Sequence, residues 1–115
     1  MDEGLPIGWR ERGAAWAAGK ERIHELHHFG SRAKGTFIPG ESDVDLAYLL
    51  TGEEHGEKLA YSIFECGDCE HELQQVMDVM VDLEFTDNVD DLAVWRWVRE
   101  HGQLLYRKPR LPPLE

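Results

Sequence analysis

Three aspartates stand where two short strands are expected, and their spacing suits the binding of divalent cations. Asp43 and Asp45 are two residues apart in the sequence. Side chains two apart on a strand share one face and lie roughly 6–7 Å apart along it. Both carboxylates can therefore share hard cations such as Mg²⁺, which prefers oxygen ligands. Asp82 stands in a second, otherwise apolar stretch at 79–83, and it joins the same face if the two strands are neighbours.

Three carboxylates held in this way indicate a particular chemistry. Two metal ions, roughly 3.5–4 Å apart, stabilise both the attacking and the leaving oxygen of an in-line phosphoryl displacement. One of the carboxylates can also take the proton from the attacking hydroxyl. We therefore predict that Asp43, Asp45 and Asp82 are catalytic and bind the metal. The alternative for Asp82 is a solvated position on an edge strand.

A glycine and a serine upstream of the acids predict a phosphate site. Gly30 and Ser31 open a turn or short helix, and a helix N-terminus offers unpaired N–H groups and a positive dipole end. Glycine lets a phosphate approach the backbone closely, and the serine hydroxyl adds a donor. Arg32 and Lys34 follow at once and can add positive charge.

The remaining sequence predicts a small α+β domain that holds these residues. Apolar alternation and short apolar runs predict strands at 26–29, 43–50, 79–85 and 103–106. Helical spacing predicts helices at 8–22, 56–77 and 89–101. We expect Gly67 to break the second helical stretch and Gly102 to end the last one. This order favours a mixed sheet in two α/β layers, with the helices packed mainly on one face.

Length and charge limit the class of protein. The 115 residues fit one domain, expected over 1–106, followed by a flexible tail at 107–115. A net charge of −11 argues against direct binding of nucleic acid, although a nucleotide can still bind through metal ions. We expect no membrane span and no signal peptide, and hence a cytoplasmic protein.

The motifs together resemble a known signature. The run His-Phe-Gly-Ser-Arg-Ala-Lys-Gly at 28–35, followed by Ser-Asp-Val-Asp-Leu at 42–46, resembles that of minimal nucleotidyltransferases of the DNA polymerase β superfamily. Eleven residues separate Ser31 from Asp43, one more than the commonest spacing, which lengthens a loop. The stretch 81–83 is similar to the strand with the family's third carboxylate.

The resemblance implies the nucleotidyltransferase fold and the transfer of a nucleoside monophosphate from a nucleoside triphosphate. It implies two Mg²⁺ ions, with Mn²⁺ as an alternative, and we expect ATP as the triphosphate. The metal ligands and catalytic residues would be Asp43, Asp45 and Asp82. The nucleotide-binding residues would be Gly30, Ser31, Arg32, Lys34 and Ser42.

Within the superfamily, the chain is most similar to the stand-alone members that are paired with helical HEPN proteins in toxin–antitoxin modules. Such proteins add AMP to a tyrosine of the HEPN protein and silence its ribonuclease activity. The resemblance therefore implies a HEPN partner, in a homo- or hetero-oligomer. Two alternatives stay open: an antitoxin that acts by contact alone, and a nucleotidyltransferase for a small molecule such as an aminoglycoside.

Two other pairs of side chains have more than one interpretation. His27 and His28 either serve the metal or the catalysis, or are ordinary residues of a strand edge. Trp95 and Trp97 cannot share one narrow helical face because they are two residues apart. One of them is expected to be exposed and to mark a partner surface.

The two cysteines also have two interpretations. Cys66 and Cys69, with His71, contain half of a zinc-binding motif, whereas structural zinc normally needs four ligands. The alternative is a pair of buried cysteines on a helix face. Two cysteines cannot form a disulfide framework, and nothing in the sequence indicates an oxidising compartment.

Overall fold

The computed structural model describes residues 7–29, 44–52, 54–87 and 93–109. In chain order its elements are α1 (Trp9–Ala18), β1 (Ile23–Phe29), β2 (Val44–Leu50), α3 (His55–Phe64), α4 (Cys69–Met77), β3 (Val81–Phe85), α5 (Ala93–His101) and β4 (Gln103–Arg107). Within these residues the chain is an α+β domain, as predicted from the sequence.

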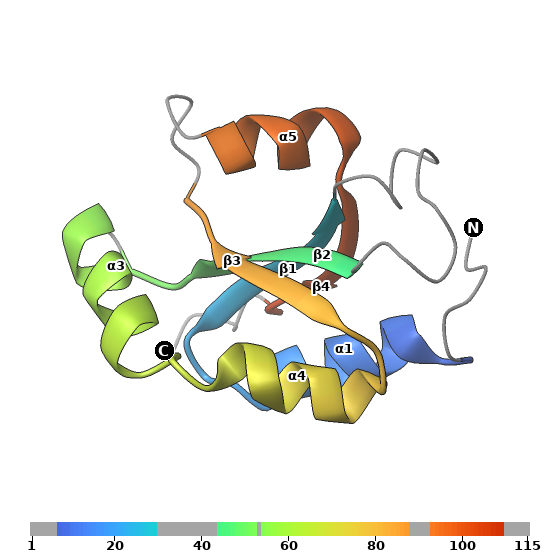
Figure 1. Cartoon of the computed structure of the whole chain (residues 1–115). Helices are drawn as coiled ribbons and strands as arrows, with labels where there is room; N and C mark the ends of the chain where they lie inside the picture. The colour runs from blue at the N-terminus through green and yellow to red at the C-terminus, as the bar shows by residue number, and fades with distance from the viewer. Residues whose placement is uncertain (1–6, 30–43, 53, 88–92, 110–115) are drawn as a thin grey trace, which may run out of the picture.

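The strands form one mixed sheet in the order β3-β2-β1-β4. β1 is antiparallel to both of its neighbours, β2 and β4. β2 and β3 are parallel, and the stretch that joins them contains α3 and α4 (Figure 1). β3 is an edge strand of the sheet, which is the position that the alternative interpretation of Asp82 required.

Helices α1 and α4 cover one face of the sheet, and α5 lies across the opposite face (Figure 1). The main core lies between the sheet and helices α1 and α4. Its largest fully buried side chains include Trp9, Ile23, Leu26, Leu46, Leu73 and Met77. β2 contributes every second residue to this core, because alternate side chains of a strand point to opposite faces. The predicted α+β fold, a mixed sheet with helices packed against it, is confirmed.

The bounds of several elements differ from those predicted, and β3, for example, begins at Val81 rather than at residue 79. α1 ends at Ala18 because Gly19 caps it, with its N–H donating to Ala15 O and Trp16 O. The chain then enters β1 at Ile23, three residues before the expected start of this strand. β4 runs to Arg107, one residue further than expected.

The backbone beyond β4 stays paired for one more residue, since Lys108 N–H donates to His24 O over 2.7 Å. The first residues of the expected tail are therefore attached to the sheet, and residues 110–115 lie outside the described part.

Two glycines were predicted to interrupt helices, and both do so. Gly67 lies in the connection between α3 and α4. Gly102 joins α5 directly to β4, and a Cβ atom at this position would collide with the carbonyl oxygen of Val98. The tight turn that brings β4 back beside β1 thus depends on glycine. None of the described helices is both long and apolar enough to cross a bilayer.

Candidate active site

The parallel strands β2 and β3 bring two of the three predicted acids together. Their register pairs Asp45 with Asp82. Paired residues of neighbouring strands point to the same face, and the strands lie about 4.8 Å apart, so the two carboxylates stand side by side. Both side chains are half-buried and lie on the face opposite the main core. The geometric condition that the sequence left open, that the two strands be neighbours, is therefore met.

A further carboxylate lies on this face, and the sequence analysis did not single it out. Glu84 is paired with Ala47, two residues beyond Asp82, so it points to the same side. Burial, and then the negative charges of Asp82 and Glu70, raise the pKa of Glu84. A raised carboxyl pKa means that the surroundings disfavour further negative charge. The alternation of polar and apolar residues in β3 was the signal that could have found it.

The described part of this site fits a hard divalent cation. Two carboxylates from adjacent strands supply the oxygen ligands that Mg²⁺ prefers. Among the residues that the structure describes, no three His, Cys, Asp or Glu side chains gather closely enough to hold a metal ion. Asp43, the third predicted ligand, lies outside these residues, so Asp45 and Asp82 are the described part of the predicted ligand set.

The predicted phosphate-binding segment also lies outside the described residues. This holds for Gly30, Ser31, Arg32, Lys34 and Ser42. The segment runs between two well-defined points, since β1 ends at Phe29 and β2 begins at Val44. Phe29 is paired with Asp45 across the sheet. β1 therefore ends, and β2 begins, next to the paired acids.

His27 borders the face of the acids. It is paired with Ala47, and its Nε2 atom lies 2.7 Å from Glu25 Oε1. Its ring meets that of Trp95 edge to face, with the centroids 6.5 Å apart. α5 therefore covers this part of the sheet, and His27 is 9% exposed. Its contacts hold it within the layer between β1 and α5.

His28, the next residue, points to the other face. It is 1% exposed, and its ring meets that of Trp9 of α1 at 5.0 Å between centroids. This position in the core separates His28 from the acids by the thickness of the sheet. His28 therefore cannot act in metal binding or catalysis beside Asp45 and Asp82, and its role is to pack in the core.

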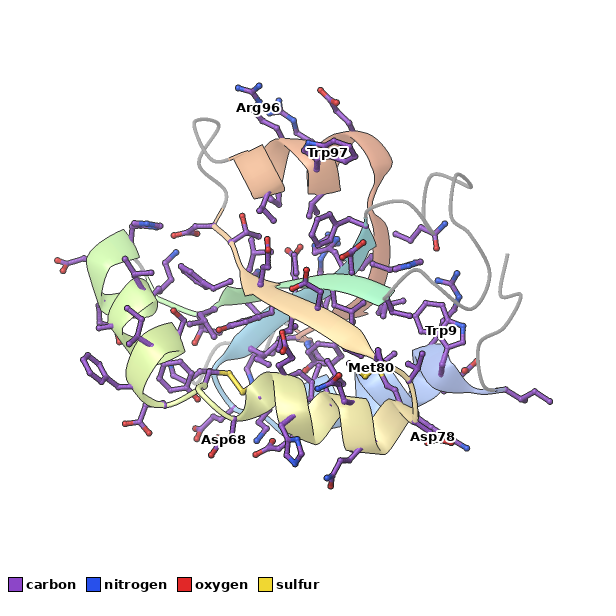
Figure 2. The ribbon with its side chains drawn as sticks, viewed as in Figure 1. Trp9, Asp68, Asp78, Met80, Arg96 and Trp97 are labelled. Atoms are coloured by element: carbon purple, nitrogen blue, oxygen red, sulfur yellow. A yellow bond between two sulfur atoms is a disulfide. The ribbon has the colours of Figure 1, made fainter. Side chains whose placement is uncertain are left out.

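The two tryptophans of α5 differ in exposure, as expected. Trp95 contacts His27, whereas Trp97 is 44% exposed. Figure 2 places Trp97 and Arg96 on the outer side of α5, away from the sheet. The prediction that one of the two tryptophans is exposed is confirmed.

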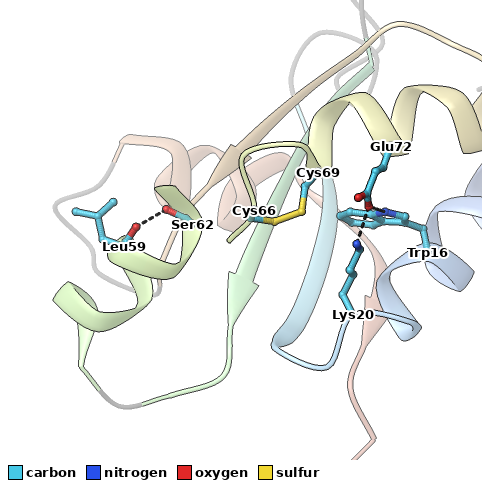
Figure 3. The surroundings of a disulfide bond; sticks show 7 residues. All are labelled: Trp16, Lys20, Leu59, Ser62, Cys66, Cys69 and Glu72. Carbon is cyan, nitrogen blue, oxygen red and sulfur yellow. Dashed lines mark hydrogen bonds and ion pairs between the residues drawn. A yellow bond between two sulfur atoms is a disulfide. The ribbon is translucent and has the colours of Figure 1, made fainter. Parts of the chain in front are cut away.

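The two cysteines form a disulfide, which the sequence analysis did not anticipate (Figure 3). Cys66 and Cys69 are both buried, as expected. Their sulfur atoms bind each other, so they are not the zinc ligands of the half-motif. The bond ties the connection after α3 to the first residue of α4. The Cys-x-x-Cys spacing was the available signal, and it was not decisive because the same spacing serves metal sites.

A buried ion pair joins α3 to the end of β3, and no sequence pattern indicated it. Lys58 Nζ lies 2.8 Å from Asp87 Oδ1, and His55 Nδ1 lies 2.9 Å from Asp87 Oδ2. Lys58 and Asp87 are 6% and 3% exposed. A buried charge is costly unless it is paired, so this contact fixes where α3 stands. Asp87 lies beyond the end of β3, five residues after Asp82, and is not part of the acid pair.

Comparisons with known proteins agree with this geometry. Residues 17–109 match the family model described as the nucleotidyltransferase domain. This range includes both paired acids and all four strands. Among proteins with curated functions, none matches the sequence significantly.

Several solved structures share the fold. A toxin–antitoxin crystallised with AMP-PNP has a TM-score of 0.59 at 20% identity, covering 86% of this chain and 73% of that chain. A protein from Sulfolobus solfataricus, described as a candidate nucleotidyltransferase, has a TM-score of 0.51 at 19% identity, covering 86% and 77%. A variant of the MntA–HpeT toxin–antitoxin has a TM-score of 0.52 at 18% identity, covering 77% and 64%. At such identities the likeness establishes the fold alone.

Proposed function

The chain belongs to the nucleotidyltransferase domain family, and from this premise we propose that it transfers AMP from ATP to a hydroxyl of a partner protein. The partner would be a helical HEPN protein, and the pair would form a toxin–antitoxin module in which this chain is the antitoxin. The activity as a nucleotidyltransferase follows from the family. The nucleotide, the metal, the acceptor and a cytoplasmic location are the parts that we propose.

The observation that carries the proposal is the register of β2 and β3. It pairs Asp45 with Asp82 on one face, and Phe29, the residue before Gly30 and Ser31 in the sequence, is paired with Asp45. Oxygen donors next to a phosphate-binding turn are what the transfer of a nucleoside monophosphate needs. The likeness to a toxin–antitoxin crystallised with AMP-PNP supports ATP as the donor and a protein as the partner.

The proposed reaction is an in-line displacement at the α-phosphorus of ATP. The acceptor oxygen forms a bond to this phosphorus, the bond to the bridging oxygen of the β-phosphate breaks, and pyrophosphate leaves. The proton of the acceptor hydroxyl passes to one of the carboxylates. Divalent cations bound by Asp43, Asp45 and Asp82 would neutralise the charge that develops on the phosphoryl oxygens.

An incorporation assay tests the proposal. Purified chain, Mg²⁺ and each NTP labelled at the α-phosphate are incubated with host lysate, and the labelled protein is identified by mass. We expect label from ATP on one protein, and none with the Asp43→Asn/Asp45→Asn variant. Equal labelling by that variant would show that the acids are not the catalytic residues. No label with any NTP would exclude the proposed transfer.

One observation favours a second function, that of an antitoxin that acts by contact without transfer. α3 presents large apolar side chains to solvent, as a binding surface does. In that case the Asp43→Asn/Asp45→Asn variant would silence the partner to the same extent as the wild type does. Measuring the partner's ribonuclease activity with each of the two proteins separates the two functions.

A further inference from the structure

α3 exposes the apolar side chains that a surface helix normally buries. A surface helix normally turns its apolar stripe to the core and its charges to solvent. In α3 the buried residue is Lys58, at 6% exposed, whereas Leu59, Ile63 and Phe64 are 41%, 60% and 80% exposed. Leu59 and Ile63 are four residues apart and lie one above the other on the helix. The outer side of α3 is thus an apolar ridge formed by Leu59, Ile63 and Phe64.

The ridge is held in place by one buried and one exposed polar contact of α3, and by the disulfide that follows the helix. Lys58 pairs with the buried Asp87. Near the start of the helix, Arg22 Nη1 and Nη2 donate to the two carboxylate oxygens of Glu57 over 2.8 and 2.9 Å. At the other end, the disulfide at Cys66 fixes the chain that leaves the helix. A helix fixed at both ends loses little freedom when it docks, which favours binding.

The charges around the ridge decide between two occupants. Glu54, Glu65 and Asp68 are exposed and flank the helix at its two ends, and Figure 2 places Asp68 on the outside of the turn between α3 and α4. A second copy of this chain would bring the same acidic flanks against these, in a protein with a net charge of −11. Like charges across an interface are unfavourable. A surface with an apolar groove and Lys or Arg at its rim is complementary.

We propose that the ridge on α3 is the docking surface for the protein acceptor, which binds it through an apolar groove rimmed by basic residues. This inference rests on the proposed function, because it takes the acceptor to be a protein. α3 begins beyond the end of β2, whereas Asp45 lies five residues before Leu50 in that strand. The ridge is on the solvent side of α3, whereas Asp45 and Asp82 lie on a face of the sheet, so the ridge is separate from the acid pair.

This separation gives the docking surface a kinetic signature. Loss of the ridge weakens the capture of the acceptor and leaves the chemistry of the bound complex unchanged, so KM for the acceptor rises while kcat holds. Loss of an acid has the opposite effect, because it removes a group that acts in the transition state.

The experiment uses the full chain and the acceptor protein identified by the labelling assay. Ile63→Ser/Phe64→Ser is compared with Val76→Ser, a matched control on α4 whose exposed fraction is 41%. We expect KM for the acceptor to rise at least tenfold in the double variant, with kcat and the affinity for Mg²⁺–ATP within twofold of wild type. The control should match the wild type in all three quantities. Circular dichroism verifies that each variant is folded.

Each contrary outcome overturns a different statement. An unchanged KM in the double variant, with labelling intact, excludes the docking surface and leaves the proposed function standing. A wild-type dimer in sedimentation that the double variant dissociates would assign the ridge to a second copy instead. If the wild type labels no protein, the proposed function fails and the docking assignment fails with it.

Discussion

Asp45 and Asp82 place two carboxylates side by side, and a bound cation changes the electrostatic free energy of this pair. Two unit charges about 5 Å apart repel by about 3 kcal/mol at an effective dielectric constant near 20. A divalent cation between them replaces this repulsion with attraction. Only the folded chain holds the pair together, so binding of the cation stabilises the folded state alone.

We therefore expect Mg²⁺ to raise the midpoint of thermal unfolding of the wild type by several degrees. Asp45→Asn/Asp82→Asn should abolish this rise, because the amides keep the shape and lose the charge. Differential scanning fluorimetry in EDTA and in Mg²⁺ measures both effects. The exposed Asp68→Asn is the matched control and should respond to Mg²⁺ as the wild type does. An undiminished rise in the double variant would place the cation elsewhere.

The two neighbouring histidines illustrate what a single residue reveals through its sequence alone. Alternation along a strand requires that His27 and His28 point to opposite faces, but it does not say which face is the core. Trp9 decides this, since its ring receives His28. The residue that packs against a histidine can lie anywhere in the chain, so the sequence left both roles open.

At the scale of elements, α1 and α4 are joined by one polar contact whose strength depends on pH. Glu72 Oε1 lies 2.6 Å from Lys20 Nζ and accepts a hydrogen bond from Trp16 Nε1 over 3.2 Å (Figure 3). Hydrogen bonds from Lys20 and then Trp16 lower the pKa of Glu72 below its ordinary value of 4.5. A lowered carboxyl pKa stabilises the fold above the ordinary value, and this stabilisation disappears as the pH falls through the lowered one.

Glu72→Gln should therefore lower the stability at pH 7 and have a smaller effect at pH 3. The side chain of Glu72 is 44% exposed, so solvent screens the contact and we expect a loss of about 0.5 kcal/mol. Chemical unfolding at the two pH values measures the difference, with the exposed Glu65→Gln as control. A loss that is as large at pH 3 as at pH 7 would contradict the assignment to the ionised carboxylate.

The disulfide between α3 and α4 closes a very short loop, with a sequence separation of 3 between Cys66 and Cys69. The loop-entropy relation gives about 2 kcal/mol for such a bond. We expect a reducing agent to lower the unfolding midpoint of the wild type by several degrees, and to leave that of Cys66→Ser/Cys69→Ser unchanged. Thermal scans with and without dithiothreitol make the comparison. Two thiols that react with an alkylating reagent before any reduction would show that the bond is absent.

This measurement also bears on location. Disulfides persist in oxidising surroundings, whereas the sequence analysis expected a cytoplasmic protein. If dithiothreitol opens the bond readily and the protein stays folded, the bond is compatible with an oxidising location and with a cytoplasmic one.

The elements that could be predicted are those whose own residues specify them. β2 is a short apolar run and β3 alternates apolar and polar side chains, so the existence of both strands followed from local pattern. The shared face of Asp45 and Asp82 also required the two strands to be neighbours, which the local pattern does not specify. The turns at Gly67 and Gly102 followed from the lack of a side chain.

Other elements depend on contacts between distant parts of the chain, and these escaped prediction. The orientation of α3 is set by the pairing of Lys58 with Asp87, which are 29 residues apart. A stripe of apolar residues predicts that a helix buries it. α3 has such a stripe and exposes it, because the inner side of the helix is held by charge instead.

At the scale of the whole molecule, the excess of acidic residues determines which charged partners the protein attracts. A net charge of −11 sets up a negative potential that repels polyanions and attracts cationic surfaces. Salt screens such attraction, with a Debye length of about 8 Å at physiological ionic strength. The encounter with a basic acceptor should therefore slow as salt is added, while contacts of the apolar ridge persist once formed.

We expect the association rate constant for the acceptor to fall at least tenfold between 50 and 500 mM NaCl, with a much smaller change in the dissociation rate constant. Glu65→Gln/Asp68→Gln removes two charges beside the ridge and should make this dependence shallower. Ile63→Ser/Phe64→Ser should instead raise the dissociation rate constant and keep the same dependence on salt. Surface plasmon resonance across the salt range resolves both constants. An association rate constant that is indifferent to salt would show that the acceptor surface is not basic, and it would leave the apolar ridge as the sole determinant of docking.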